Sequence, residues 1–203
     1  MSPEWAIHRK WGELLFHFSE PEIDKLIDLE QHDAGRYDPS VLKEQLDYVR
    51  RKWGEVGAYY YILHHLLDRA EDILLSELSS KLDAPQTRLP SPDKFTEELL
   101  HSFKKRFEED SKSLMTYLEE TQWFYEVFSY KGALCALVRD IINRERFREK
   151  LTRVMLTKSV ARYYFPKKPM PPSAIFIAEY VEKIVKELYR CVEEEKEKGL
   201  AKL

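Results

Sequence analysis

A long run of apolar side chains, spaced alternately three and four residues apart, constrains the fold of this chain more than any other feature. The run consists of Leu42, Leu46, Val49, Trp53, Val56, Tyr60, Leu63, Leu67, Ala70 and Leu74. Side chains at this spacing keep to one stripe of an α-helix. The run therefore predicts a single helix of about forty residues that packs lengthwise against a partner. Gly54 and Gly57 lie inside it and weaken it locally, which allows a bend or a close backbone approach.

A second run with similar spacing follows a connector that is rich in proline, at residues 82–92. After a shorter helical pattern from Asp93 to Phe107, this run consists of Leu114, Leu118, Thr121, Tyr125, Phe128, Gly132, Cys135, Val138 and Ile142. Asp110 and Ser111 are predicted to cap the helix that carries it. Two long helices joined by a modest connector form an α-hairpin, in which the stripes bury one another or serve an oligomer.

Proline and glycine mark the remaining boundaries. Pro21 follows a capping serine, Ser19, and predicts the start of a helix, and Gly35 predicts a helix end before a new start at Asp38–Pro39. Beyond a proline-rich joint at residues 166–173, the sequence from Ala174 onward is amphipathic. We therefore expect an all-α fold: a long antiparallel helical hairpin or coiled-coil-like bundle at 38–165, short helices at 1–37 and a helical arm at 166–203.

The positions expected to form helix-packing or oligomer contacts are Leu42, Leu46, Val49, Trp53, Val56, Tyr60, Leu63, Leu67 and Gly132.

Composition excludes several kinds of site and partner. The chain has 33 basic and 36 acidic side chains and a net charge of -3, so no general attraction to polyanions is expected. Cys135 and Cys191 lack metal-type spacing and are predicted to be two thiols in a reducing compartment. No signal-peptide pattern and no membrane-length apolar run occur. We expect a cytoplasmic protein with no cofactor and no membrane contact.

A local basic segment stands out between Arg144 and Lys168, with nine basic residues against two acidic ones and several aromatic residues between them. Cations neutralise phosphates and aromatic faces stack bases, which together suit single-stranded nucleic acid. The predicted DNA-binding residues are Arg144, Arg146, Arg148, Lys150, Arg153, Lys158, Arg162, Tyr163, Tyr164, Phe165, Lys167 and Lys168.

The stretch YKGALCALVRDIINR, from Tyr130 to Arg144, lies downstream of the aromatic cluster Trp123-Phe124-Tyr125. With the two long helical patterns it resembles the UvsY recombination mediators of tailed phages, over about residues 38–146. Two features depart from that family: the first long helix ends with only Lys81 in place of a basic and aromatic cluster, and the arm beyond Phe147 has no counterpart in the short members.

The resemblance implies an accessory protein and not an enzyme, located in the host cytoplasm if a phage encodes it. Such proteins bind single-stranded DNA, form ring-like homo-oligomers and help a RecA-like recombinase to replace the single-strand-binding protein. In this chain the contact with DNA is expected to have moved to the arm.

An enzymatic alternative comes from the stretch EQHDAGRYDPS, Glu30 to Ser40. An HD-type phosphohydrolase uses histidines and aspartates from several helices to hold metal ions that activate water against a phosphate ester. The stretch HHLLDRAED places His64 and Asp68 one turn apart on a helix. Residues of these types occur in a permissible order at His8, His32, Asp33, His64 or His65, His101 and Asp140. Polar residues, Glu30 and Gln31, precede the His32–Asp33 pair, so the pair is expected to face solvent. Gly35 is expected to end the preceding helix.

A third interpretation is a coiled-coil scaffold or adaptor whose partners are proteins. The sequence contains no glycine-rich phosphate loop, zinc-type cysteine spacing or nucleophile elbow. A di-iron bundle needs two Glu-x-x-His units, and Glu98 to His101 is the only one.

Overall fold

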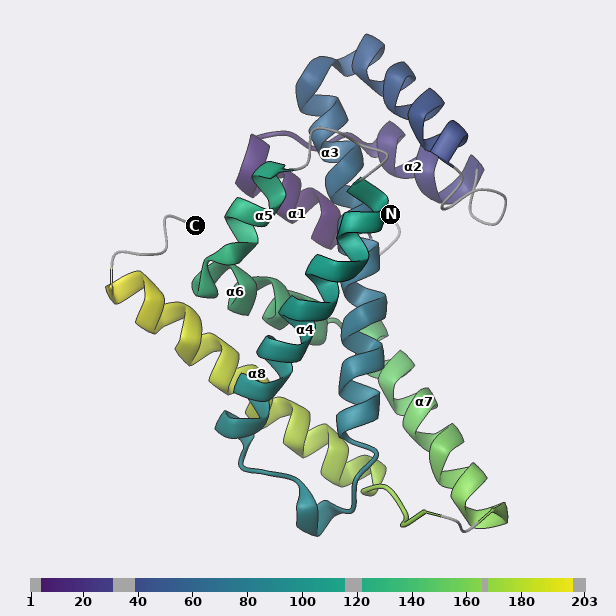
Figure 1. Ribbon diagram of the computed structural model, residues 1–203, viewed down its shortest axis with the longest axis vertical. Coiled ribbons are helices and arrows are strands. Elements are labelled where there is room, and N and C mark those ends of the chain that lie inside the picture. The colour runs from purple at the N-terminus through teal and green to yellow at the C-terminus, as the bar shows by residue number, and fades with distance from the viewer. Residues whose placement is uncertain (1–4, 31–38, 116–121, 166–167, 199–203) are drawn as a thin grey trace. The chain divides into compact units, whose positions relative to one another are not determined.

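The computed structural model describes residues 5–30, 39–115, 122–165 and 168–198, and every regular element in those ranges is helical (Figure 1). The elements are α1 Trp5–Phe16, α2 Pro21–Glu30, α3 Pro39–Lys81, the short 3-10 helix η1 Gln86–Arg88, α4 Pro92–Met115, α5 Gln122–Ser129, α6 Lys131–Ile142, α7 Glu145–Tyr164 and α8 Ala174–Glu197. The predicted all-α fold is confirmed. In the same ranges, none of the helices is both long enough and apolar enough to cross a bilayer.

The chain packs as two compact units, each built from two stretches of sequence. The first unit contains residues 1–70 and 108–125, and the second contains residues 71–107 and 126–203. Both units are discontinuous, so the three-part organisation with boundaries near residues 37 and 165 stays a prediction.

Helix starts follow the proline and serine signals of the sequence. α2 begins at Pro21. The backbone N–H of Glu22, in the first turn, donates to the Glu20 carboxylate at 3.0 Å. Ser19, the predicted capping residue, instead donates its hydroxyl hydrogen to the Glu13 carboxylate. α8 begins after Ser173, whose hydroxyl oxygen accepts a hydrogen bond from the Phe176 backbone N–H. Side-chain oxygens thus satisfy N–H groups that have no partner inside the helix.

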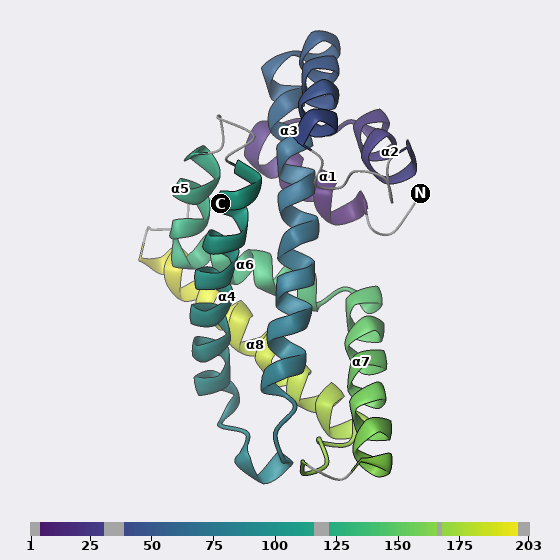
Figure 2. The ribbon, with the colours of Figure 1, turned by 45° about the vertical axis from the view of Figure 1, so that its right-hand side comes forward.

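The first long helix is not one continuous rod. Gly54 has φ 73° and ψ -165°, a conformation outside the helical region. The ribbon of α3 turns sharply in its N-terminal part (Figures 1 and 2). Glycine adopts positive φ without the steric penalty of a Cβ atom. The prediction of a single helix of about forty residues is therefore wrong at this point. α3 consists of an N-terminal segment, 39–53, and a C-terminal segment, 55–81.

The second run of apolar side chains is also divided. α4 continues past Asp110 and Ser111 to Met115, so these residues do not begin a helix. α5 and α6 are separate because Tyr130 has extended backbone angles, φ -72° and ψ 126°. An extended residue ends the ladder of helical hydrogen bonds and redirects the chain.

Most of the predicted packing positions are buried within the chain. Leu42, Leu46, Val49, Tyr60, Leu63, Leu67 and Gly132 are buried, whereas Trp53 and Val56 are half-buried. The stripe thus contributes to the core of a unit, and a role between chains stays a prediction.

A disulfide joins α6 to α8 in the second unit. Cys135 and Cys191 are bonded, with their Cα atoms 6.3 Å apart. The prediction of two free thiols is therefore wrong. Their separation of 56 residues carries no pairing signal in the sequence. The two helices pack directly on one another, and this packing brings the sulfur atoms together.

Loss of this disulfide should destabilise the second unit. A cross-link across 56 residues restricts the unfolded chain, and its removal is expected to cost about 2–4 kcal/mol. The double substitution Cys135→Ser with Cys191→Ser should lower the urea midpoint measured by circular dichroism under non-reducing conditions. Equal midpoints for the variant and the oxidised parent would contradict the bond.

Candidate metal centre

Three helices of the first unit bring two histidines and three aspartates together. This His–Asp cluster consists of His8 from α1, Asp24 and Asp28 from α2, and His64 and Asp68 from α3. His8, Asp24 and His64 are buried. The side chains of Asp28 and Asp68 are 21% and 23% exposed, so one side of the cluster reaches solvent.

Helical periodicity explains how these polar groups reach the interior. Asp24 and Asp28 lie four residues apart and alternate with the buried Ile23 and Ile27 on α2. The α3 residues Tyr60, His64 and Asp68 repeat at the same interval. Residues four apart share one face of a helix, so each helix presents a short column of polar groups.

Asp24, on α2, accepts hydrogen bonds from side chains of α1 and α3. Its carboxylate lies 2.8 Å from the Tyr60 hydroxyl, 3.1 Å from Arg9 Nε and 3.0 Å from His64 Nδ1. Burial, followed by the nearby Asp24 charge, raises the pKa of Tyr60, so the hydroxyl remains a donor. With three donors, Asp24 is suited to orient His64 rather than to bind an ion itself.

The other nitrogen of His64 faces a second group of acceptors. His64 Nε2 lies 3.3 Å from Asp28 Oδ1 and 3.6 Å from Asp68 Oδ2. His8 Nε2 lies 3.2 Å from the other oxygen of Asp68. The two imidazole rings are stacked, with centroids 3.7 Å apart. His64 therefore belongs to two groups of three potential ligands, one with His8 and Asp24 and one with Asp28 and Asp68.

The electrostatics of the two histidines differ. Burial opposes a charge on His64, but its hydrogen bonds to Asp24 and Asp28 outweigh burial and raise the pKa of His64 to about 9. Burial, reinforced by the neighbouring His64 charge, lowers the pKa of His8. Without an ion, His64 is protonated and His8 is neutral at pH 7. Of the described residues, none forms a hydrogen bond with the buried Nδ1 of His8.

The spacing of these groups fits the coordination shell of a metal ion. Ligands bonded at about 2.1 Å lie about 3.0 Å apart at neighbouring octahedral positions and about 3.4 Å apart in a tetrahedron. The three separations that link His8 to Asp68, Asp68 to His64 and His64 to Asp28 run from 3.2 to 3.6 Å. A divalent ion would balance the charges of Asp28 and Asp68, while Arg9 offsets Asp24.

The cluster contains part of the residue set predicted for a phosphohydrolase. His8, His64 and Asp68 belong to it. His65 instead contacts the Tyr61 ring, with centroids 4.7 Å apart. The remaining predicted residues lie elsewhere: His32 and Asp33 fall outside the described residues, His101 is exposed on α4 and Asp140 binds Arg139.

Asp24 and Asp28 were missed by the sequence analysis. Their four-residue spacing on a helix with buried isoleucines was the available signal, and it matches the spacing of His64 and Asp68.

The basic segment predicted to bind DNA lies in the second unit, where several of its side chains form ion pairs within the chain. Arg144 and Lys150 both contact the Glu71 carboxylate at 2.6 Å. Arg162 binds both oxygens of Asp83. Lys158 donates to the Ser79 carbonyl and Arg148 donates to the Ile142 carbonyl. These contacts reduce the positive charge that remains for a ligand.

Other members of the predicted DNA-binding set face solvent. Arg146, Arg153, Lys168, Tyr163, Tyr164 and Phe165 are exposed. Lys167 lies outside the described residues. The three consecutive aromatic residues at the end of α7 are the most accessible part of the set, at 77%, 69% and 72%.

Comparisons of this chain with protein-family models, curated proteins and solved structures give no match. Function must therefore be argued from the site itself.

The metal-free protein should lose stability with rising pH because of His64. The pKa of His64 is about 9 in the folded chain, against 6.5 as its ordinary value. Its charge therefore contributes full stability below about pH 6.5, and this contribution is lost as pH rises through about 9. We expect the Tm of chelator-treated protein to fall across this window more steeply than that of His64→Gln.

The matched control is His101→Gln on the exposed surface of α4, which should reproduce the slope of the parent. Parallel curves for the parent and His64→Gln would show that His64 is not charged in the folded protein.

Proposed function

We propose that the His–Asp cluster binds a divalent transition-metal ion and that the first unit hydrolyses a phosphate ester with it. The observation that carries this proposal is the group of Asp28, His64 and Asp68, whose potential ligand atoms all lie within 4.8 Å of one another. His8 Nε2 lies 3.2 Å from the other oxygen of Asp68, and Asp24 binds the opposite nitrogen of His64. A carboxylate on the second nitrogen of a ligating histidine fixes the tautomer and orientation that a metal site requires.

The chemistry of the donors favours Mn²⁺, Fe²⁺ or Zn²⁺. Two imidazoles and two carboxylates form a mixed nitrogen and oxygen set, which suits these ions. Mg²⁺ and Ca²⁺ prefer oxygen ligands alone. Binding requires His64 to give up its Nε2 proton, since that nitrogen would become a ligand. The Nδ1 hydrogen bond to Asp24 can remain in place.

The exposed side of the cluster supports a catalytic rather than a purely structural ion. Asp28 and Asp68 are partly accessible, whereas His8 and His64 close the inner side. Coordination positions on the solvent side would then hold water and a phosphate oxygen. An ion held by these residues would lower the pKa of a bound water to about 7 and offset the charge of the phosphate.

The protein's own groups complete the reaction. One of the two partly exposed carboxylates accepts a proton from the attacking water, while the oxygen of that water bonds to phosphorus. The bond between phosphorus and the ester oxygen breaks, and the same proton passes to the departing alcohol. Trp5 donates its indole N–H to Asp28, which holds that carboxylate in position.

Metal binding and hydrolysis should depend on the same side chains. We expect the parent protein to bind one Mn²⁺ or Zn²⁺ ion per chain in calorimetry and to hydrolyse bis(p-nitrophenyl) phosphate. His8→Ala and Asp68→Asn should weaken metal binding by at least about tenfold and abolish hydrolysis.

His101→Ala provides the control, because it removes an imidazole from an exposed position outside the cluster. Equal metal affinity in the parent and in Asp68→Asn would mean that the cluster is only a hydrogen-bonded ion-pair network. Metal binding without hydrolysis of any phosphodiester or phosphomonoester probe would reject the catalytic part of the proposal.

The exposed end of α7 favours a second candidate function, single-stranded DNA binding as a recombination mediator. Tyr163, Tyr164 and Phe165 offer aromatic faces to solvent, and such faces stack bases without reading sequence. Arg153 is exposed on the same helix, ten residues before Tyr163, and no described residue forms an ion pair with it. A RecA-like recombinase, a single-strand-binding protein and a second copy of the chain are the partners that this function would involve.

If α7 stacks bases, replacing all three aromatic residues by alanine should weaken binding of a labelled oligonucleotide by tenfold or more in fluorescence anisotropy. Arg190→Gln, on the exposed face of α8, should bind like the parent and serves as a control for charge. Unchanged affinity in the triple variant, or no binding by the parent at low salt, would reject this function.

A further inference from the structure

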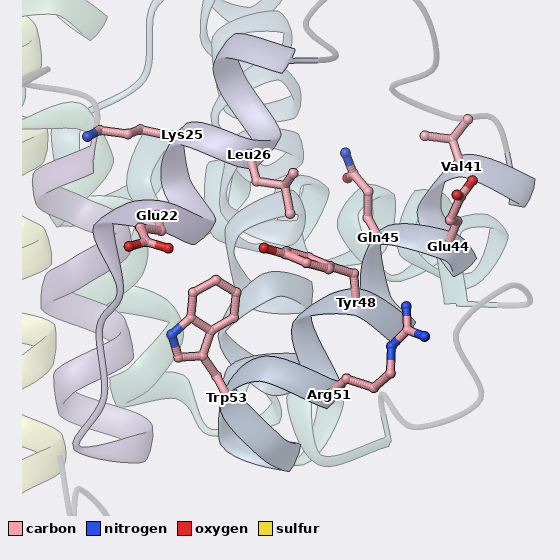
Figure 3. Close-up of a pocket in the computed structure, with 9 residues that line it drawn as sticks. All are labelled: Glu22, Lys25, Leu26, Val41, Glu44, Gln45, Tyr48, Arg51 and Trp53. Carbon is pink, nitrogen blue, oxygen red and sulfur yellow. The ribbon is translucent and has the colours of Figure 1, made fainter.

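A pocket of about 510 Å³ lies in the first unit between α2 and the N-terminal segment of α3 (Figure 3). Its volume falls within the range of small-molecule sites, about 300–1,000 Å³. None of the residues that line it belongs to the His–Asp cluster. It is a separate feature of the first unit.

Two aromatic side chains form adjoining walls of the pocket. The rings of Tyr48 and Trp53 are nearly perpendicular, at 85°, with centroids 6.1 Å apart. Lys52 places its ammonium group 4.3 Å from the centre of the Trp53 ring and also binds Glu22 on α2. These contacts hold the indole in position. Tyr48 remains 43% exposed, so part of its ring is accessible to a ligand.

A buried donor without an acceptor lines the same pocket. Gln45 is only 8% exposed, and its side-chain oxygen accepts a hydrogen bond from the Tyr61 hydroxyl at 2.7 Å. That bond assigns the remaining amide group, Nε2, as a donor. Nε2 is buried and has no hydrogen-bond partner among the described residues. Because an unsatisfied buried donor is unfavourable, a ligand acceptor at this position would be stabilised.

Two cations and two carboxylates line the pocket, and they differ in whether they already have a partner. Arg51 and Lys25 line it, and neither forms an ion pair with any described carboxylate. Glu22 is already bound to Lys52, which leaves Glu44 as the one lining carboxylate without an ion pair among the described residues. In Figure 3 the Lys25 ammonium group points away from the aromatic pair. Arg51 follows Tyr48 by three residues on the same helical segment, so the two residues lie on one face of it. Arg51 is therefore the cation placed to meet a ligand.

We propose that this pocket binds a nucleotide. The base packs against the accessible ring of Tyr48, a base or ribose acceptor receives the hydrogen bond of Gln45 Nε2, and the phosphate pairs with Arg51. A planar ring with an attached anion uses all three features, and arginine is well suited to phosphate because its guanidinium group is planar and forms paired hydrogen bonds. The inference stands whether or not the cluster binds a metal.

The direct test is calorimetry of EDTA-treated protein with AMP, GMP, CMP and UMP, each titrated alone. At least one should bind, and its affinity should fall by tenfold or more in Arg51→Gln and in Tyr48→Ala. The matching nucleoside, which lacks phosphate, should bind the parent and Arg51→Gln with equal affinity. Lys43→Gln removes an exposed cation from the same helical segment outside the pocket and should leave nucleotide binding unchanged.

Failure of all four monophosphates to bind the parent would overturn the proposal, as would equal affinity in the parent, Arg51→Gln and Tyr48→Ala. Circular dichroism of each variant shows whether its helices are retained, and Tyr48→Phe, which keeps the ring, should bind like the parent. EDTA is present throughout, so nucleotide binding is measured without a metal ion. Asp68→Asn, which alters the proposed metal site, should bind nucleotide like the parent. Failure of nucleotide binding is therefore distinguishable from failure of metal binding.

Discussion

The buried carboxylate of Asp24 is the interaction on which the arrangement of the first unit depends. It has no exposed surface and accepts hydrogen bonds from Arg9, Tyr60 and His64. A buried charge costs several kcal/mol unless it is paired and fully hydrogen-bonded, so the helices α1, α2 and α3 must all be in place to satisfy it. The same bonds fix the ring of His64, which directs its other nitrogen towards Asp28 and Asp68.

Close packing of α1 supports this arrangement. A Cβ atom at Gly12 would lie 2.5 Å from the Tyr60 ring and 2.5 Å from the Phe18 carbonyl oxygen. Only glycine fits this contact without displacement, and the contact places the Tyr60 hydroxyl against Asp24. Tyr60 therefore contacts both the backbone of α1 at Gly12 and Asp24 of the His–Asp cluster.

Sequence periodicity predicted the helices but not the contacts between distant segments. The apolar run marked the buried face of α3, yet it gave Tyr60 only a packing role and did not require the break at Gly54. Charge along the chain indicated a basic surface, whereas Glu71 and Asp83 bind Arg144 and Arg162 from 73 and 79 residues away. Pairing of Cys135 with Cys191 is likewise a tertiary effect. Within the His–Asp cluster, residue type and order in the sequence predicted His8, His64 and Asp68. Asp24 and Asp28 could be assigned only from the folded geometry.

The central claim is that a metal ion replaces the Nε2 proton of His64 while Asp24 keeps the Nδ1 hydrogen bond. A crystal structure of the Mn²⁺- or Zn²⁺-loaded protein, with anomalous scattering measured at the edge of that metal, tests it directly. We expect an anomalous peak bonded to His8 Nε2, His64 Nε2 and oxygens of Asp28 and Asp68, with Asp24 still hydrogen-bonded to His64 Nδ1. An ion bound only at other side chains, with His64 Nε2 still hydrogen-bonded to the carboxylates, would contradict it.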